Sequence, residues 1–107
     1  MATQGLITVR SGGQVVMKVV TGSDGYNAQI LSDLIKARWP LSPEDAYELA
    51  LSAGFGSSAS LVVLTEDSEC YQCDDDLSPL YRETFYQPRF NPRWRNGTAD
   101  HIIIIDI

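Results

Sequence analysis

Apolar and polar residues alternate weakly at the start of the chain, in two short runs that a Gly-Gly pair separates. The runs are residues 5–10 (GLITVR) and 14–20 (QVVMKVV), and both are rich in β-branched residues. Two such runs around a glycine turn predict a β-hairpin. Leu6 and Ile7 are consecutive and cannot share one face of a strand, so the pattern leaves the register open.

The apolar spacing becomes helical after a turn at residues 21–26. The apolar positions that form one helical stripe are Ile30, Leu31, Leu34, Ile35 and Trp39. Asn27 is a candidate N-cap. Pro40 ends the predicted helix, because the residue before a proline avoids helical backbone angles.

Residues 42–45 (SPED) predict the start of a second helix. Ser42 is a capping residue, proline suits the first helical position, and the two acids favour the positive end of the helix dipole. Ala46, Leu49 and the alanines that follow form a narrow apolar face. Gly54 is expected to close the helix.

Three further strands are predicted in the second half of the chain. Residues 60–65 (SLVVLT) form an unbroken apolar run, which is typical of a strand inside a sheet. Residues 80–86 are predicted to form a strand, with a helical turn as the competing interpretation. Residues 101–107 (HIIIIDI) are the last strand and are apolar on both faces.

This order, ββααβββ, predicts the α+β class and a single domain over residues 1–107. We expect a mostly antiparallel sheet of four to five strands with two helices on one face. The other face also needs a cover, because both sides of the last strand are apolar. A second copy of the chain is one such cover, so we expect a homodimer.

The composition indicates a folded protein outside the membrane. Hydrophobic residues make up 44% and charged residues 21% of the chain, which excludes the disordered class. No run approaches the roughly 18 apolar residues that cross a bilayer. The first residues lack the features of a secretory signal, so we expect a soluble, cytoplasmic protein.

The net charge of −6 argues against general nucleic-acid binding, which needs a basic surface. Acids are concentrated in residues 66–76, and half of the basic residues lie in 82–95. One interpretation is that these segments face each other and neutralise part of the charge. The other is a basic, aromatic binding strip that the acidic segment shields.

The stretch CYQCDDD at residues 70–76 is the first candidate site. Cys70 and Cys73 have the spacing of a zinc knuckle. Four ligands would be completed by Asp74, Asp76 or His101, or by the same cysteine pair of a second subunit at a dimer axis. A thiol-redox pair is the second interpretation, but the neighbouring acids disfavour a thiolate. The third is an acidic surface loop. No cofactor is expected, with zinc as the possible exception.

Two other segments are candidate binding sites. Asp24, Gly25 and Tyr26 precede a helix, where free backbone N–H groups can hold a small anionic ligand; an ordinary Asp-Gly turn is the alternative. An aromatic, arginine-bearing segment is a candidate protein interface, because both residue types are enriched at interfaces. Its residues are Tyr81, Phe85, Phe90, Arg93, Trp94 and Arg95.

The pieces GLITVR, SDGYNA and HIIIID resemble small uncharacterised bacterial and phage domains. Such domains open with an I-x-V hairpin, turn at D-G-Y and close on a strand that ends in Ile-Asp. The resemblance covers about a third of the residues and implies a bacterial or phage origin but no chemistry. The CYQCDDD stretch is outside it.

The function that this sequence favours is a non-catalytic interaction module that self-associates. The alternative is a metal or thiol protein that uses Cys70 and Cys73 with the adjoining aspartates. The third is a small-molecule enzyme with a pocket near Asp24 and Tyr26.

Overall fold

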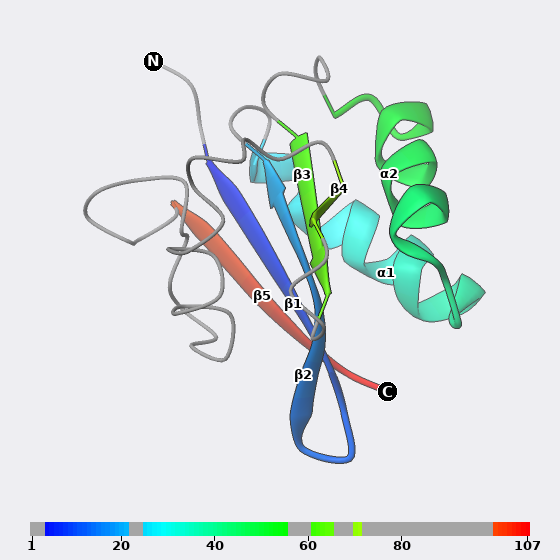
Figure 1. The fold of residues 1–107 in the computed structure, drawn as a ribbon. Helices are drawn as coiled ribbons and strands as arrows, with labels where there is room; N and C mark the ends of the chain where they lie inside the picture. Colours follow the sequence, from blue (N-terminus) through cyan, green and yellow to red (C-terminus); the bar gives the residue numbers. More distant parts are fainter. Residues whose placement is uncertain (1–3, 22–24, 56–60, 66–69, 72–99) are drawn as a thin grey trace.

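The computed structural model describes residues 4–21, 25–55, 61–65, 70–71 and 100–107 (Figure 1). These residues form strands, two α-helices and one turn of 3-10 helix. The strands are β1 (Gly5–Ser11), β2 (Gln14–Thr21), β3 (Leu61–Thr65), β4 (Cys70–Tyr71) and β5 (His101–Asp106). The helices are η1 (Gly25–Asn27), α1 (Ala28–Arg38) and α2 (Pro43–Ser52).

The strands form one mixed sheet in the order β4-β3-β2-β1-β5. Three neighbouring pairs are antiparallel, as expected, but β5 pairs with β1 in the parallel direction. Parallel neighbours need a long crossover connection. Between β1 and β5 along the chain, the described residues include both helices and the three strands β2, β3 and β4. The parallel direction therefore depends on the path of the whole chain, and the local hydrophobic periodicity of the sequence does not predict it.

The β1–β2 hairpin confirms the first prediction and settles its register. Gly12 and Gly13 form the two-residue loop with φ of 61° and 82°, a left-handed conformation at both positions that glycine tolerates best. A bulge between Val9 and Arg10 shifts the pairing. Ile7 then packs with the residues on one face of the sheet, and Leu6 with those on the other.

Helix α1 ends where the sequence predicts and begins slightly differently. Asn27 occupies the predicted N-cap position, but its side chain makes no capping hydrogen bond. The position of the cap is therefore confirmed, whereas the expected side-chain bond is absent. A turn of 3-10 helix leads into the first α-helical turn instead. Trp39 is extended, as a residue before proline should be.

Helix α2 has both of its predicted ends. The Ser42 hydroxyl accepts a hydrogen bond from the Asp45 backbone N–H at 3.1 Å, and Pro43 is the first helical residue. At the other end the Gly54 N–H donates to the Leu51 carbonyl at 3.1 Å, and the Phe55 N–H donates to the Ala50 carbonyl at 3.0 Å. With φ of 91° at Gly54, this is the Schellman arrangement.

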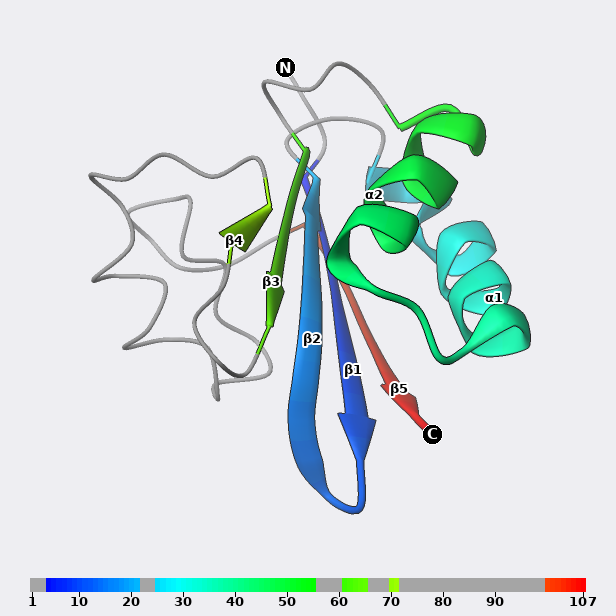
Figure 2. The ribbon, with the colours of Figure 1, turned by 45° about the vertical axis from the view of Figure 1, so that its right-hand side comes forward.

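Both helices cover the same face of the sheet (Figure 2). Leu31 and Ile35 of α1 are fully buried there against Val9, Val19 and other sheet residues. The opposite face holds a second apolar cluster, composed of Leu6, Val15, Val20, Val62 and Leu64 with the partly buried Ile102. This second cluster is buried within one chain, so its burial does not require the partner subunit that the sequence suggested.

The remaining strand predictions have mixed outcomes. β3 and β5 confirm the runs at residues 60–65 and 101–107, and β3 lies inside the sheet. β4 is a two-residue strand where only an acidic segment was expected. The predicted strand at residues 80–86 lies outside the described residues.

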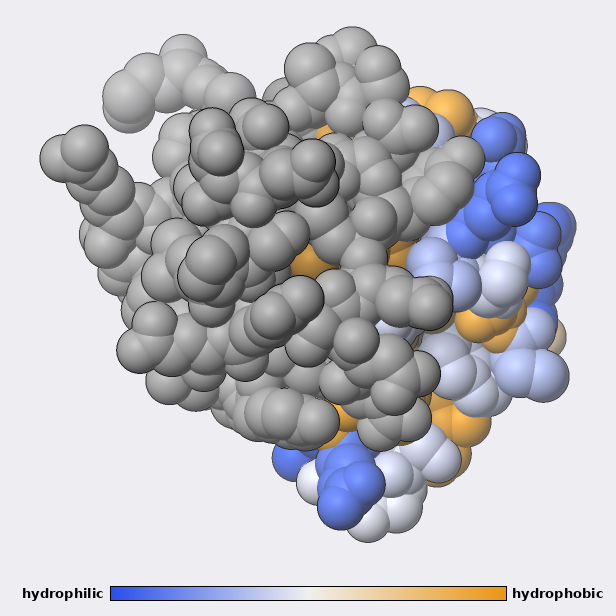
Figure 3. All heavy atoms as spheres, in the orientation of Figure 1, coloured by the Kyte–Doolittle hydropathy of each residue, from blue (hydrophilic) through white to orange (hydrophobic). Residues whose placement is uncertain are grey.

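The outer surface of the helices is polar. In the space-filling view the coloured residues on the helix side are mostly hydrophilic, with smaller apolar areas between them (Figure 3). Within the described part of the chain, neither helix is long and apolar enough to cross a membrane.

Candidate functional site

Strand β5 forms one edge of the sheet, and its hydrogen bonds to β1 show which backbone groups face outward. The His101 N–H donates to the Gln4 carbonyl at 3.0 Å, and the Ile107 N–H donates to the Arg10 carbonyl at 2.8 Å. In a strand, backbone groups alternate in direction from residue to residue. The backbone N–H and C=O groups of the odd-numbered residues of β5 therefore point toward β1. Those of Ile102, Ile104 and Asp106 point outward, in the plane of the sheet and away from β1.

Within the described part of the chain, the outer edge of β5 shows few of the features that usually protect an edge strand. Among the described residues no strand pairs with this edge. Its sequence, HIIIID, contains no proline and no lysine, and its pairing with β1 has no bulge. Ile104 is 39% exposed. An apolar, β-branched edge without such protection is a template for pairing with another strand.

A hollow of about 320 Å³ lies between α1 and this edge. Its floor includes the buried Ile105 and Ser32. The Ser32 hydroxyl donates to the Ala28 carbonyl at 2.8 Å, so it is satisfied within its own helix. The other lining residues are Gln29, Asp33, Lys36, Ile103, Ile104 and Asp106. An extended segment along β5 would find space here for side chains on the helix face.

An ion pair holds the end of β5 to β1. The parallel register places Arg10 beside Asp106, and the guanidinium donates two hydrogen bonds to the carboxylate, at 2.8 and 2.9 Å. These bonds lower the pKa of Asp106, and the positive charges of Arg10 and Lys36 add to that effect. Because both side chains are well exposed, the pair contributes little to stability but fixes the direction of the two groups.

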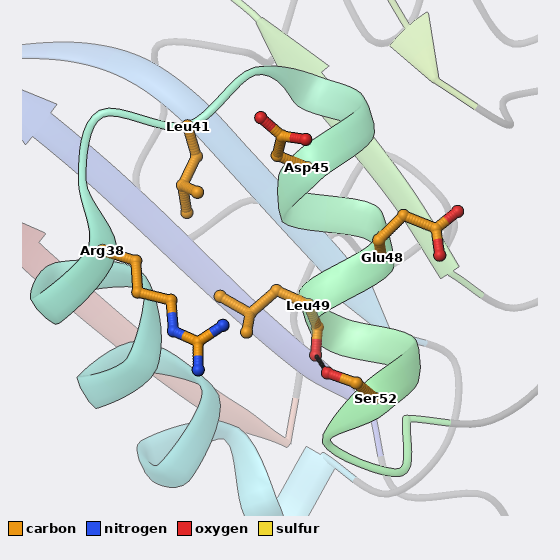
Figure 4. Close-up of a pocket in the computed structure, with 6 residues that line it drawn as sticks. All are labelled: Arg38, Leu41, Asp45, Glu48, Leu49 and Ser52. Carbon is orange, nitrogen blue, oxygen red and sulfur yellow. Dashed lines mark hydrogen bonds between the residues drawn. The ribbon is translucent and has the colours of Figure 1, made fainter.

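A second hollow, of about 450 Å³, lies between the end of α1 and α2 (Figure 4). Arg38 reaches across it toward Leu49, while the Glu48 carboxylate points away from Arg38. The Ser52 hydroxyl is occupied, because it donates to the Leu49 carbonyl at 2.9 Å. The hollow is lined by one base and two acids on an open surface, and of these charged groups Arg38 is the one that reaches across it.

Lys18 is a buried charged group in the middle of the sheet. It is 0% exposed and lies between Thr8 and Leu64 of the neighbouring strands. Burial lowers the pKa of Lys18 to about 8, because the charged form loses its hydration. Its position is on the sheet face opposite the helices, away from the hollow beside β5.

Only one residue of the predicted metal or thiol site, Cys70, lies among the described residues. Cys70 lies in β4, paired with Leu64 of β3. Cys73, Asp74 and Asp76 lie outside the described residues. In the described ranges, no group of three or more potential metal ligands comes together. The metal and redox interpretations of CYQCDDD therefore remain predictions.

The other predicted sites are also placed in part. Asp24 lies outside the described residues, whereas Gly25 and Tyr26 form η1. Tyr26 is 63% exposed, and neither hollow described above includes it. The aromatic segment, with Tyr81, Phe85, Phe90, Arg93, Trp94 and Arg95, lies outside the described residues and remains a predicted interface. β5 lies at the edge of the sheet, and a contribution of this last strand to an interface also remains a prediction.

Comparison with known proteins found no family model, curated protein or solved structure that matches this chain. The site therefore has to be judged on its own geometry. Sequence reasoning missed the Arg10–Asp106 pair and the participation of Lys36. A signal was present, since Arg10 is the next-to-last residue of β1, Asp106 is the last residue of β5, and their charges are opposite. The two opposite charges indicate an ion pair only once β1 and β5 are known to be parallel neighbours.

Proposed function

We propose that this protein is an interaction module that binds an extended protein segment by strand addition to the outer edge of β5. The observation that carries the proposal is the edge itself, with outward backbone groups at Ile102, Ile104 and Asp106. An added strand would satisfy these groups with a ladder of main-chain hydrogen bonds, which supply affinity in this mode of recognition.

The hollow between α1 and β5 supports an extended protein segment as the occupant rather than a small molecule. It runs beside a strand instead of closing around a volume, and it contains backbone edge on one side and helix side chains on the other. Alternate side chains of an added strand point to one face of the sheet. Those on the helix face would meet Ser32, Lys36 and the apolar floor at Ile105.

The test uses proline at Ile104, where only the outward N–H is lost. That N–H faces away from β1, so the β1–β5 pairing should survive, whereas an added strand loses a donor and meets the proline ring. The probe is a labelled peptide of alternating threonine and valine with lysines at its ends. We expect Ile104→Pro to weaken its binding by at least about tenfold in fluorescence anisotropy.

Ile104→Thr is the matched control, because it shortens the same side chain but keeps the N–H and a β-branched shape. Its affinity for the peptide should stay within about threefold of that of the original protein. Circular dichroism of both variants establishes that they remain folded. Equal peptide binding by the folded Ile104→Pro variant and the original protein would rule out strand addition at this edge.

A further inference from the structure

We infer that the strand added to β5 is β5 of a second copy of this chain, in antiparallel orientation. The inference rests on the proposed function, because it uses the same edge, and it adds the identity of the partner. A two-fold axis perpendicular to the sheet would bring two identical edges together and join the two sheets into one. The helices of both copies would then lie on the same face.

Symmetry leaves few registers for this pairing. In an antiparallel pair, the side chains of directly opposite residues lie on the same face of the sheet. The two-fold axis must therefore lie between one residue and the same residue of the second copy, and the choice of that central residue defines the register. Centring on Ile103 would place Asp106 opposite Asp100 of the second copy. Like charges directly opposite each other in a sheet are destabilising.

Centring on Ile104 avoids this repulsion. Ile104 then meets its own copy at the axis, and each Ile102 lies opposite Asp106 of the other chain. All of these residues direct their backbone groups outward, so the register forms about six main-chain hydrogen bonds. Ile104 is 39% exposed in one chain, and this pairing would bury it. We therefore expect the interface to be centred on Ile104.

The charge around the edge also favours a second copy. The whole chain carries a net charge of −6, so two copies repel each other over most orientations. The hollow beside β5 carries both signs of charge, because Asp33 and Asp106 lie there with Lys36, and Arg10 pairs with Asp106. A surface of mixed sign on an acidic protein lets two copies approach on this side with less repulsion.

Sedimentation-velocity ultracentrifugation of the full chain over a range of concentrations tests the inference. We expect a monomer–dimer equilibrium whose dissociation constant rises at least about tenfold in Ile104→Pro and changes little in Ile104→Thr. Ile104→Lys is a second disruptive variant that keeps the backbone N–H. It places two ammonium groups opposite each other at the axis and should also dissociate the dimer, less completely at high salt.

The outcomes separate this inference from the proposed function. A protein that stays monomeric at all concentrations, yet binds the threonine–valine peptide at Ile104, overturns the second-copy inference and leaves strand addition intact. A dimer that neither Ile104→Pro nor Ile104→Lys weakens also overturns the inference, because the copies then meet elsewhere. A dimer lost in both variants and kept in Ile104→Thr supports it.

Discussion

Replacing Ile35 by alanine is expected to lower the free energy of unfolding by about 3–4 kcal/mol. Ile35 is 0% exposed and packs in the cluster between the helices and the sheet. The substitution removes buried methyl and methylene groups and leaves a cavity that the two-layer packing cannot easily close. Urea denaturation monitored by circular dichroism measures the change. For a domain of this size the loss is a large part of the total stability.

Ile30→Ala is the matched control, since it is the same substitution in the same helix. Ile30 is 57% exposed, so its replacement should change the free energy of unfolding by less than about 0.5 kcal/mol. The difference between the two variants measures which face of α1 is buried. Similar losses for both would mean that α1 does not present its Ile35 face to the sheet as the structure shows.

The second large effect is a rise in stability at alkaline pH that depends on Lys18. Burial lowers the pKa of this lysine to about 8, compared with 10.5 for a free lysine. Between these values the unfolded chain binds more protons than the folded one, so folding stability increases as the pH rises. The difference between the two pKa values corresponds to at most about 3.4 kcal/mol. Because relaxation around a buried charge lowers such effects, we expect about 1–2 kcal/mol.

Lys18→Met and Lys36→Met form the pair that tests this effect. Methionine cannot titrate, so the rise between pH 8 and 10.5 should be reduced in Lys18→Met by the amount that the buried lysine supplies. Lys36 is exposed on α1, and Lys36→Met controls for the loss of one positive charge over the same pH range. Parallel stability curves for Lys18→Met and the original protein would contradict the buried, destabilised ammonium.

The sequence was sufficient to predict the elements that depend on local chemistry. Ser42, Pro43 and Gly54 mark the ends of α2 because a cap, a first-turn proline and a left-handed glycine act within a few residues. Gly12 and Gly13 likewise determine the hairpin turn. Asn27 shows the limit of this reasoning, because a capping residue type was present and made no capping bond.

The candidate site was less predictable because it depends on distant parts of the chain. Arg10 and Asp106 are 96 residues apart in sequence and meet only through the parallel β1–β5 register. The edge position of β5 is likewise a property of the strand order. Apolar residues on both faces of this strand did correctly indicate that both faces are covered, since Ile105 belongs to the cluster under the helices and Ile102 packs against the opposite cluster. The burial of Lys18 had no local signal, since a lysine in a strand, here between Met17 and Val19, normally faces water.

The central claim is that the outward backbone groups of β5 receive another strand, and their amides test it most directly. Nitrogen-15 NMR of the protein, titrated with the threonine–valine peptide at a protein concentration where the chain is monomeric, observes each amide separately. The account predicts slowed hydrogen exchange at Ile102, Ile104 and Asp106, while Ile103 and Ile105, already bonded to β1, stay protected throughout. Unchanged exchange at the three even-numbered residues, with peptide bound, would contradict it.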